Sequence, residues 1–288
     1  MKLALGTVQF GMTYGIANRT GQVSQEQIDG ILDVARASGI DTIDTAIGYG
    51  DSEERLGVAG VNDFNVVSKL PPLPGDVSDV RAWVYEAIEG SLSRLGVDKL
   101  HGLMLHRSAD YQGHRGAEIF AALNDLKNQA RIEKLGISIY APEELDAVLA
   151  DYSIDIVQAP FNAIDQRLTR SGWLERLKQR NIEVHTRSAF LQGLLLMSQA
   201  ERPRKFGKWG KAWDAWDGWL RGNNLSPLEG ALCFVGAFPA IDCVVVGVDD
   251  VEQLRGIIAA SGREAPDVPS LCATDDPKLI DPSNWKKL

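Results

Sequence analysis

The feature that most restricts the fold of this 288-residue chain is the alternation of short, β-branched apolar segments with longer amphipathic ones. Short apolar runs between turn residues are typical of buried strands. Eight such runs predict strands at residues 3–7, 41–46, 64–70, 99–106, 134–140, 154–160, 182–189 and 241–248. Because the segments between them are long enough for crossover helices, the strands are expected to be parallel.

The amphipathic segments predict helices between the strands. In the clearest, at residues 77–95, apolar residues recur every three or four positions and include Val80, Val84, Ile88 and Leu92. Other helices are predicted at residues 24–38, 52–59, 115–130, 142–150, 171–180, 226–238 and 250–260. Eight strand-helix units in about 250 residues close naturally as a (β/α)8 TIM barrel. We therefore expect one barrel domain over residues 1–288.

An open, doubly wound parallel sheet is the alternative fold. It is less favoured, because no G-x-G-x-x-G motif follows the first predicted strand. No linker divides the chain into halves either. The sequence thus favours the closed barrel.

One segment, residues 190–225, interrupts the alternation. It is longer than an ordinary connection between strand and helix, which makes it a candidate lid or substrate loop. It contains four tryptophans whose spacing places the indoles on one side of a helix, namely Trp209, Trp213, Trp216 and Trp219. Two interpretations stay open. The stripe packs the helix onto the barrel rim, or one or two indoles face the pocket as apolar platforms for a sugar or an aromatic substrate.

Charge and cysteine content argue against several classes of function. Thirty Lys and Arg against 39 Asp and Glu give a net charge of −9, which disfavours nucleic acid or an anionic membrane as a partner. Cys233, Cys243 and Cys272 are odd in number and lack metal-ligand spacing, which disfavours disulfides and structural zinc. No signal-peptide pattern or membrane-spanning apolar run is present. We expect a cytoplasmic protein and a monomer.

Four chemically reactive residue types come at or soon after predicted strand ends, where a barrel of this kind carries its active site. In chain order they are Asp44, Tyr49, Lys69 and His106. Taken singly, each has an ordinary structural explanation: a turn cap, a packing residue, a solvent-exposed lysine or a buried histidine. Their joint placement at one rim suggests a catalytic group instead.

Together the four groups suit proton transfer at a carbonyl. A lysine beside Tyr49 would lower the tyrosine pKa from its ordinary value of about 10, which would make the phenol a usable acid. Asp44 would keep Lys69 charged, and a neutral His106 would donate a hydrogen bond to the carbonyl oxygen. The spacing suggests no Ser-His or Cys-His nucleophile. What remains is proton transfer coupled to another change at the carbonyl carbon, such as hydride arrival from a nicotinamide.

Several motifs make the chain resemble the aldo-keto reductases from residue 3 to about residue 260. They are GTVQFG, DTAIGYGDSEERLG, SKL, SLSRLGVDKLHGLMLH, QAPFN and FLQGLLL, in that order. The resemblance implies a (β/α)8 barrel, an NAD(P)H cofactor bound without a Rossmann domain, and no metal. It also implies that Asp44, Tyr49, Lys69 and His106 are the catalytic tetrad, with Tyr49 as general acid in reduction and general base in oxidation.

The resemblance further implies a set of cofactor contacts. Ser138 and Gln158 match residues that hold the nicotinamide carboxamide, while Ile139 stands where relatives have asparagine. Arg187 stands where many relatives stack an aromatic ring on the nicotinamide; its guanidinium could stack there, or reach a phosphate or an anionic substrate. The other implied cofactor residues are Gly6, Thr7, Ser188, Leu191, Gly193, Gly247, Asp249 and Gln253.

The stretch after the last predicted strand bears on the choice between NADH and NADPH. Relatives that use NADPH place basic and hydroxyl groups there, whereas this chain has Asp249 and Asp250, with Gln253 at the arginine position. Carboxylates repel a 2′-phosphate and accept from a free 2′-hydroxyl. We therefore expect weak discrimination or a preference for NADH, unless Arg255 or a lysine within residues 204–211 restores phosphate binding.

The leading hypothesis is an NAD(P)H-dependent aldo-keto reductase that interconverts a carbonyl and an alcohol. The expected substrate is a sugar-like aldehyde, a lactol or a keto sugar. The alternative is a catalytically weak, cofactor-binding regulatory module on the same barrel. A metal-dependent hydrolase is disfavoured, because the chain has only four histidines, and His101 and His106 point to opposite faces of a regular strand.

Overall fold

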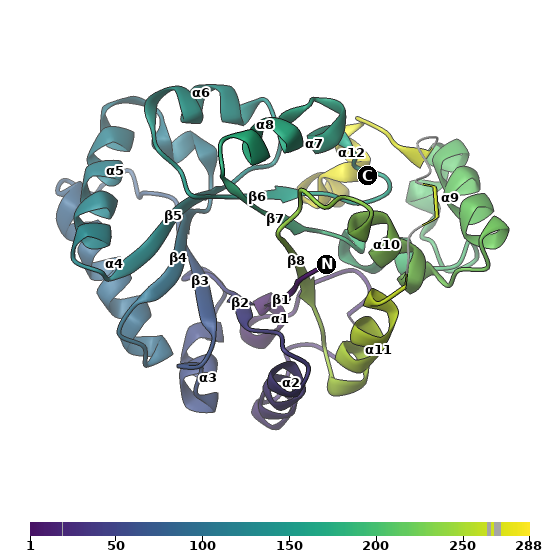
Figure 1. The fold of residues 1–288 in the computed structure, drawn as a ribbon, viewed down its shortest axis with the longest axis horizontal. Coiled ribbons are helices and arrows are strands. Elements are labelled where there is room, and N and C mark those ends of the chain that lie inside the picture. Colours follow the sequence, from purple (N-terminus) through teal and green to yellow (C-terminus); the bar gives the residue numbers. More distant parts are fainter. Residues whose placement is uncertain (19, 264–265, 268–271) are drawn as a thin grey trace.

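Eight strands form one sheet in the structure, a computed structural model that describes residues 1–18, 20–263, 266–267 and 272–288. The strands are β1 (Leu3–Gly6), β2 (Thr42–Asp44), β3 (Asn65–Leu70), β4 (Leu100–Leu105), β5 (Ile132–Ser138), β6 (Ile156–Pro160), β7 (Glu183–Arg187) and β8 (Cys243–Gly247). All neighbours are parallel, and β8 closes the ring against β1 (Figure 1). The predicted (β/α)8 barrel is confirmed, and each strand ends within two residues of its expected bounds.

Helices surround the barrel and connect successive strands (Figure 1). The longer ones are α2 (Gln25–Ala37), α3 (Ser52–Ala59), α4 (Val80–Leu95), α5 (Gly113–Asn128), α6 (Glu144–Asp151), α8 (Trp173–Gln179), α9 (Gly210–Gly222), α10 (Pro227–Gly236) and α11 (Val251–Ser261). Shorter turns, too short to show a helical repeat in the sequence, are α1 (Val8–Gly11), α7 (Arg167–Arg170), α12 (Pro277–Ile280), η1 (Ser108–Tyr111), η2 (Leu191–Leu196), η3 (Arg204–Trp209) and η5 (Pro282–Lys287).

Side chains from three strands form an apolar cluster inside the barrel. Val67, Met104 and Ile156 form a cluster in which none of the three is exposed to solvent. Two glycines make room for it. A Cβ atom at Gly102 would lie 2.9 Å from Ile156 Cδ1, and one at Gly136 would lie 2.9 Å from Met104 Cγ. Because the interior is packed, a ligand site has to lie at an end of the barrel.

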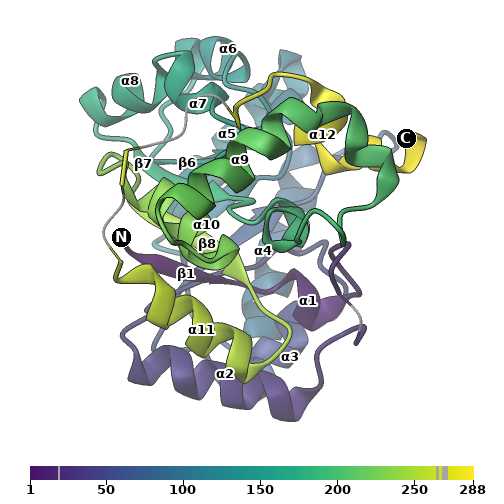
Figure 2. The ribbon, with the colours of Figure 1, turned by 90° about the vertical axis from the view of Figure 1, so that its right-hand side faces the viewer.

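Three of the four tryptophans of residues 190–225 lie in α9, which is outside the ring of strands (Figures 1 and 2), and Trp209 comes directly before it at the end of η3. Trp209, Trp213 and Trp216 are buried, and Trp219 is half-buried. The four indole N–H groups donate hydrogen bonds to Asp276, Phe206, Leu195 and Asp267. The stripe therefore packs α9 against its surroundings, as the first of the two interpretations expected.

The C-terminal turns α12 and η5 pack on the same core as the barrel. Trp285 is 3% exposed, and its ring meets that of Phe206 edge-on with the centroids 4.9 Å apart. Lys205 Nζ donates to the carbonyl oxygen of Trp285 at 2.8 Å. We propose on these contacts that residues 1–288 form a single domain. Among the described residues, no helix has the length and apolar character needed to cross a membrane.

Candidate active site

A cavity of about 550 Å³ opens at the carboxyl ends of the strands. Most of the predicted site residues line it: Gly6, Thr7, Asp44, Tyr49, His106, Ser138, Gln158, Arg187, Ser188, Gly193, Gly247, Asp249 and Gln253. Two do not. Lys69 is buried in contact with Asp44, and Leu191 is packed in the core. None of the four tryptophans of residues 209–219 is among the described residues that line the cavity, so the second interpretation of the stripe, indoles as platforms in the pocket, is not supported.

Strand register places Lys69 against Asp44. Lys69 follows Val67 of the interior cluster by two residues, so both side chains point to the same face of β3. Lys69 Nζ donates to Asp44 Oδ1 at 2.6 Å and to the Thr45 carbonyl oxygen at 2.9 Å. Gln158 Nε2 donates to the other carboxylate oxygen of Asp44 at 2.6 Å. The buried ion pair is thus held by further hydrogen bonds, which is the condition for keeping two charges out of water.

The loop that carries Tyr49 is anchored to the end of β1. Ser52 Oγ donates to the Thr7 carbonyl oxygen at 3.0 Å and lies 3.2 Å from Thr45 Oγ1. Gly11 approaches this loop so closely that a Cβ atom there would lie 1.6 Å from the carbonyl oxygen of Tyr49. These contacts fix the backbone from which the phenol projects.

Tyr49 contacts two of the other three candidate groups, Lys69 and His106. Its ring lies over Lys69, with Nζ 5.2 Å from the ring centroid. It meets His106 edge-on, with the ring centroids 5.7 Å apart and an interplanar angle of 74°. The backbone N–H of His106 donates to the Leu70 carbonyl oxygen at 3.1 Å, which ties the histidine to the end of β3. Four residues spread over 63 positions of chain therefore meet at one end of the barrel.

Burial decides the protonation of Tyr49. It raises the pKa of the phenol above its ordinary value of 10.0, while Lys69 acts in the opposite direction without cancelling the effect. The lowered pKa predicted from the sequence is wrong for the net shift, because the lost hydration of the phenolate outweighs its attraction to the Lys69 ammonium. Burial also opposes the charge on Lys69, but Asp44 and Tyr49 together raise its pKa. At neutral pH the pair is a phenol beside an ammonium.

His106 is neutral at physiological pH. Burial lowers its pKa to about 4, and Lys69 acts in the same direction. A neutral imidazole has one N–H donor and one acceptor nitrogen. Such a ring donates a hydrogen bond to a carbonyl oxygen without adding a second positive charge beside Lys69.

The groove leading from this centre fits a ligand rich in hydrogen-bonding groups. Oε1 of Gln9, a residue of the cavity wall, is buried and accepts no hydrogen bond from the described residues. A Cβ atom at Gly247 would lie 2.6 Å from the Gln9 amide nitrogen, and one at Gly193 would lie 2.5 Å from Ala17 Cβ. Backbone thus faces the groove at Gly193 and Gly247. The sequence analysis missed Gln9, although it lies in the GTVQFG motif, because an isolated amide carries no distinctive signal.

The far end of the groove carries Asp249. Its carboxylate accepts from Asn18 Nδ2 at 3.0 Å, and its backbone N–H donates to Gln253 Oε1 at 3.0 Å. Burial raises the pKa of Asp249. Asp250 has a different role: its side chain caps α11 by accepting a hydrogen bond from the backbone N–H of Gln253 at 2.8 Å. Of the two acids expected near the cofactor, only Asp249 lines the cavity.

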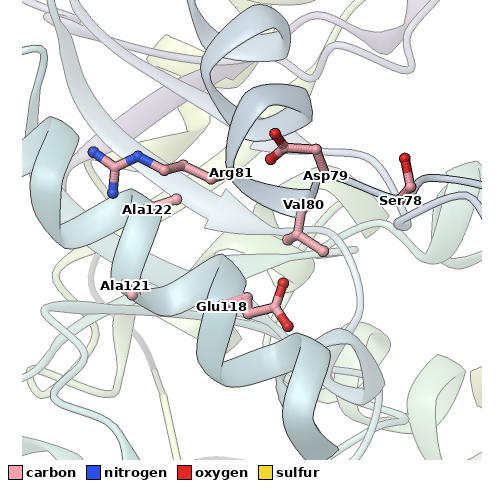
Figure 3. A pocket seen from close by; sticks show the side chains of 7 residues that line it. All are labelled: Ser78, Asp79, Val80, Arg81, Glu118, Ala121 and Ala122. Atoms are coloured by element: carbon pink, nitrogen blue, oxygen red, sulfur yellow. The ribbon is translucent and has the colours of Figure 1, made fainter.

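A second hollow lies away from this cavity. It has a volume of about 390 Å³ and lies between the first turn of α4 and α5 (Figure 3). Two of its charged groups have partners: Asp79 caps α4 at the N–H of Ala82, and Arg81 pairs with Asp125. The described ranges also contain no group of three or more His, Cys, Asp and Glu side chains placed to hold a metal ion.

Comparison with known protein families assigns the chain. The model of the aldo/keto reductase family matches residues 2–267. The chain belongs to the aldo/keto reductases. This confirms the resemblance seen in the motifs and makes the protein an NAD(P)H-dependent oxidoreductase that acts on carbonyl compounds.

The proteins similar to this aldo/keto reductase include one uncharacterized oxidoreductase and two enzymes named for a substrate. The uncharacterized oxidoreductase YqkF of Bacillus subtilis is 29% identical over 259 residues, which cover 81% of this chain and 82% of the relative. An NADH-specific methylglyoxal reductase of Escherichia coli is 30% identical over 196 residues, 58% of this chain and 57% of the relative. The solved glycerol dehydrogenase AKR11B4 of Gluconobacter oxydans, 23% identical, shares the fold with a TM-score of 0.73 over 92% of this chain and 88% of that one.

Proposed function

We propose that this aldo/keto reductase interconverts an aldehyde, keto sugar or lactol with the corresponding alcohol, and that Tyr49 is the proton donor in reduction. The observation that carries the proposal is the contact of Tyr49 with Lys69 and His106 at the mouth of one cavity. Cofactor consumption with a panel of aldehydes, aldoses and keto sugars tests it. The proposal fails if no member of the panel is turned over.

In the proposed mechanism, bound nicotinamide supplies or accepts a hydride at the carbonyl carbon. The N–H of neutral His106 orients the carbonyl oxygen toward the phenol. Tyr49 donates its proton to that oxygen as negative charge develops, and the adjacent Lys69 ammonium stabilises the phenolate left behind. Asp44 holds the ammonium in place and keeps it charged. In oxidation the same phenolate accepts the proton.

The residues proposed to hold the cofactor lie along the cavity wall. Ser138, at the end of β5, and Gln158, its register partner in the middle of β6, are the proposed partners of the nicotinamide carboxamide. The backbone near Ser188 and Gly193 is proposed to contact the pyrophosphate, and Gln9 Oε1 offers an acceptor to a hydroxyl. We propose that residues 190–196 act as the lid of this groove, since three side chains of that stretch line it whereas α9 does not.

We propose a preference for NADH over NADPH. Asp249 lies in the cavity wall, and two of the basic residues that could offset it have other partners: Arg255 pairs with Glu252, and Lys205 donates to the Trp285 carbonyl oxygen. The relative named as NADH-specific is consistent with this choice.

The preference is expected to reach about tenfold in kcat/KM, because repulsion of about 1.4 kcal/mol between carboxylate and phosphate is enough for it. Asp249→Asn should reduce the ratio toward one. Asp250→Asn is the matched control, since Asp250 caps α11 and is absent from the described wall. Steady-state kinetics with both cofactors measures the ratio. A strong preference for NADPH in the unaltered protein would contradict the proposal.

The pH profile of reduction is expected to lack a histidine titration near neutrality. The pKa of His106 is lowered to about 4, so the neutral imidazole persists as pH falls through 6.5. The protonated imidazole would add a positive charge beside Lys69, and it becomes the main form only below the lowered pKa of about 4. We therefore expect kcat/KM for reduction to stay flat between about pH 5 and pH 8. An inflection near pH 6.5 that disappears in His106→Asn would show that the ring titrates normally.

A further inference from the structure

The cavity contains a cation that the proposed proton transfer does not use. Arg187, at the end of β7, is half-buried and lines the same wall as Tyr49 and His106. Its guanidinium carbon lies 4.7 Å from the centroid of the Tyr140 ring. One terminal nitrogen donates to the Ile139 carbonyl oxygen at 3.0 Å, which holds the group against the end of β5. The guanidinium is thus fixed in position at the cavity wall.

Several N–H donors of Arg187 have no hydrogen-bond acceptor among the described residues. A guanidinium carries five N–H donors in a planar fork. Besides the bond to Ile139, only a contact with Ser188 Oγ at the long distance of 3.5 Å engages it within the described residues. None of the ion pairs formed by the described residues includes Arg187. The geometry therefore leaves N–H groups that an acceptor entering the cavity can meet.

The charges around Arg187 favour an anion. The cavity wall has two carboxylates, of which Asp44 is paired with Lys69 and Asp249 is bound to Asn18. The Lys69–Asp44 pair is neutral as a whole, so Arg187 leaves the catalytic end with a positive charge. Arg187 also contributes to lowering the pKa of His106, after burial and Lys69. Its field thus reaches the reacting centre.

Tyr140 supports the guanidinium from one side. Arg167 is fixed by Asp165, whose two carboxylate oxygens each accept from it at 2.8 Å, and it donates to the Tyr140 carbonyl oxygen at 2.8 Å. A second arginine therefore fixes the backbone of Tyr140, the residue whose ring lies against Arg187. A fork held in place from two sides suits the recognition of a carboxylate, because little side-chain freedom is lost on binding.

We propose that Arg187 makes this protein selective for carbonyl substrates that carry a carboxylate, namely oxo acids and aldehyde acids. The carboxylate pairs with the guanidinium while the carbonyl oxygen meets Tyr49 and His106. The inference rests on the proposed function and narrows its substrate class. It also gives the arginine a use other than stacking on the nicotinamide, where a cation would oppose the positive ring of the oxidised cofactor.

The test compares 4-oxobutanoate with its methyl ester, which differ in charge but share the aldehyde. We expect kcat/KM of the unaltered protein to be roughly tenfold to hundredfold higher for the acid, as a charge-assisted hydrogen-bond pair allows. Arg187→Met should bring the acid-to-ester ratio of kcat/KM toward one, chiefly by lowering kcat/KM for the acid, and Arg187→Lys should retain part of the ratio. Arg107→Met is the matched control, because Arg107 is exposed next to His106 and is not among the described residues that line the cavity.

Binding of butanoate and butanamide to the cofactor-saturated protein, followed by calorimetry, gives a readout that needs no turnover. Preference for butanoate that is lost in Arg187→Met supports the proposal. An equal acid-to-ester ratio in the unaltered protein and in Arg187→Met overturns it, as does a loss of preference in Arg107→Met. If Arg187→Met weakens cofactor binding but leaves the ratio unchanged, the arginine serves the cofactor and the proposal is wrong. If neither aldehyde is reduced, the proposed function is contradicted for this substrate pair, and the butanoate comparison still decides the part of Arg187.

Discussion

Replacing Tyr49 by phenylalanine is expected to lower kcat/KM for carbonyl reduction by about 10²- to 10⁴-fold, the range that a positioned general acid contributes. The change removes one hydroxyl and leaves a ring of the same shape over Lys69 and beside His106. The affinity for the cofactor should therefore stay within about threefold of that of the unaltered protein. Steady-state kinetics and a fluorescence titration with NADH measure the two quantities.

Tyr14→Phe is the matched control for the loss of a phenol. Tyr14 also lines the cavity, but it is 41% exposed, and its hydroxyl accepts from Gln192 Nε2 at 3.1 Å. It has no ammonium over its ring among the described contacts. We expect this variant to lose less than about tenfold in kcat/KM. Equal losses in the two variants would contradict the assignment of the proton donor to Tyr49.

Lys69→Met is expected to remove most turnover and to lower the free energy of unfolding by about 3–5 kcal/mol. Methionine has a similar length but no charge, so Asp44 would lose its cation and keep the Gln158 amide as a partner. The side chains of Lys69 and Asp44 are 1% and 6% exposed, so water cannot replace the missing ammonium. Urea unfolding measures the stability, and steady-state kinetics measures the turnover.

The double variant Lys69→Met/Asp44→Asn separates stability from catalysis. It removes both charges, so no unpaired carboxylate stays buried, and most of the lost free energy of unfolding should return. Turnover should stay low, because Tyr49 still lacks the neighbouring cation. A double variant as unstable as Lys69→Met would mean that packing, not unpaired charge, causes the loss. Recovery of turnover would exclude Lys69 from the proton-donating group.

Much of the candidate site could be predicted, because the topology of a parallel barrel brings residues at the strand ends together. In a parallel barrel every strand ends at the same rim. Correct prediction of the strand ends was therefore enough to place four residues near one another, namely Asp44, Tyr49, Lys69 and His106. Other members of the site could not be found this way. Gln9 became visible only when its amide oxygen proved to be buried without a donor.

By itself, the sequence determined the family and the barrel. Buried parallel strands require continuous apolar runs, and crossover helices require a repeat near 3.6, so both are legible in local sequence. The motifs that mark the family are local too.

Only the tertiary structure decided how the residues are hydrated and paired. Burial reversed the expected pKa shift of Tyr49. The packing of α9 buried indoles away from the cavity, and Arg187 lines the cavity without an acidic partner in the described residues. These properties depend on which distant segments exclude water from a side chain. That is settled by the packing of the whole barrel, and no local pattern of residues encodes it.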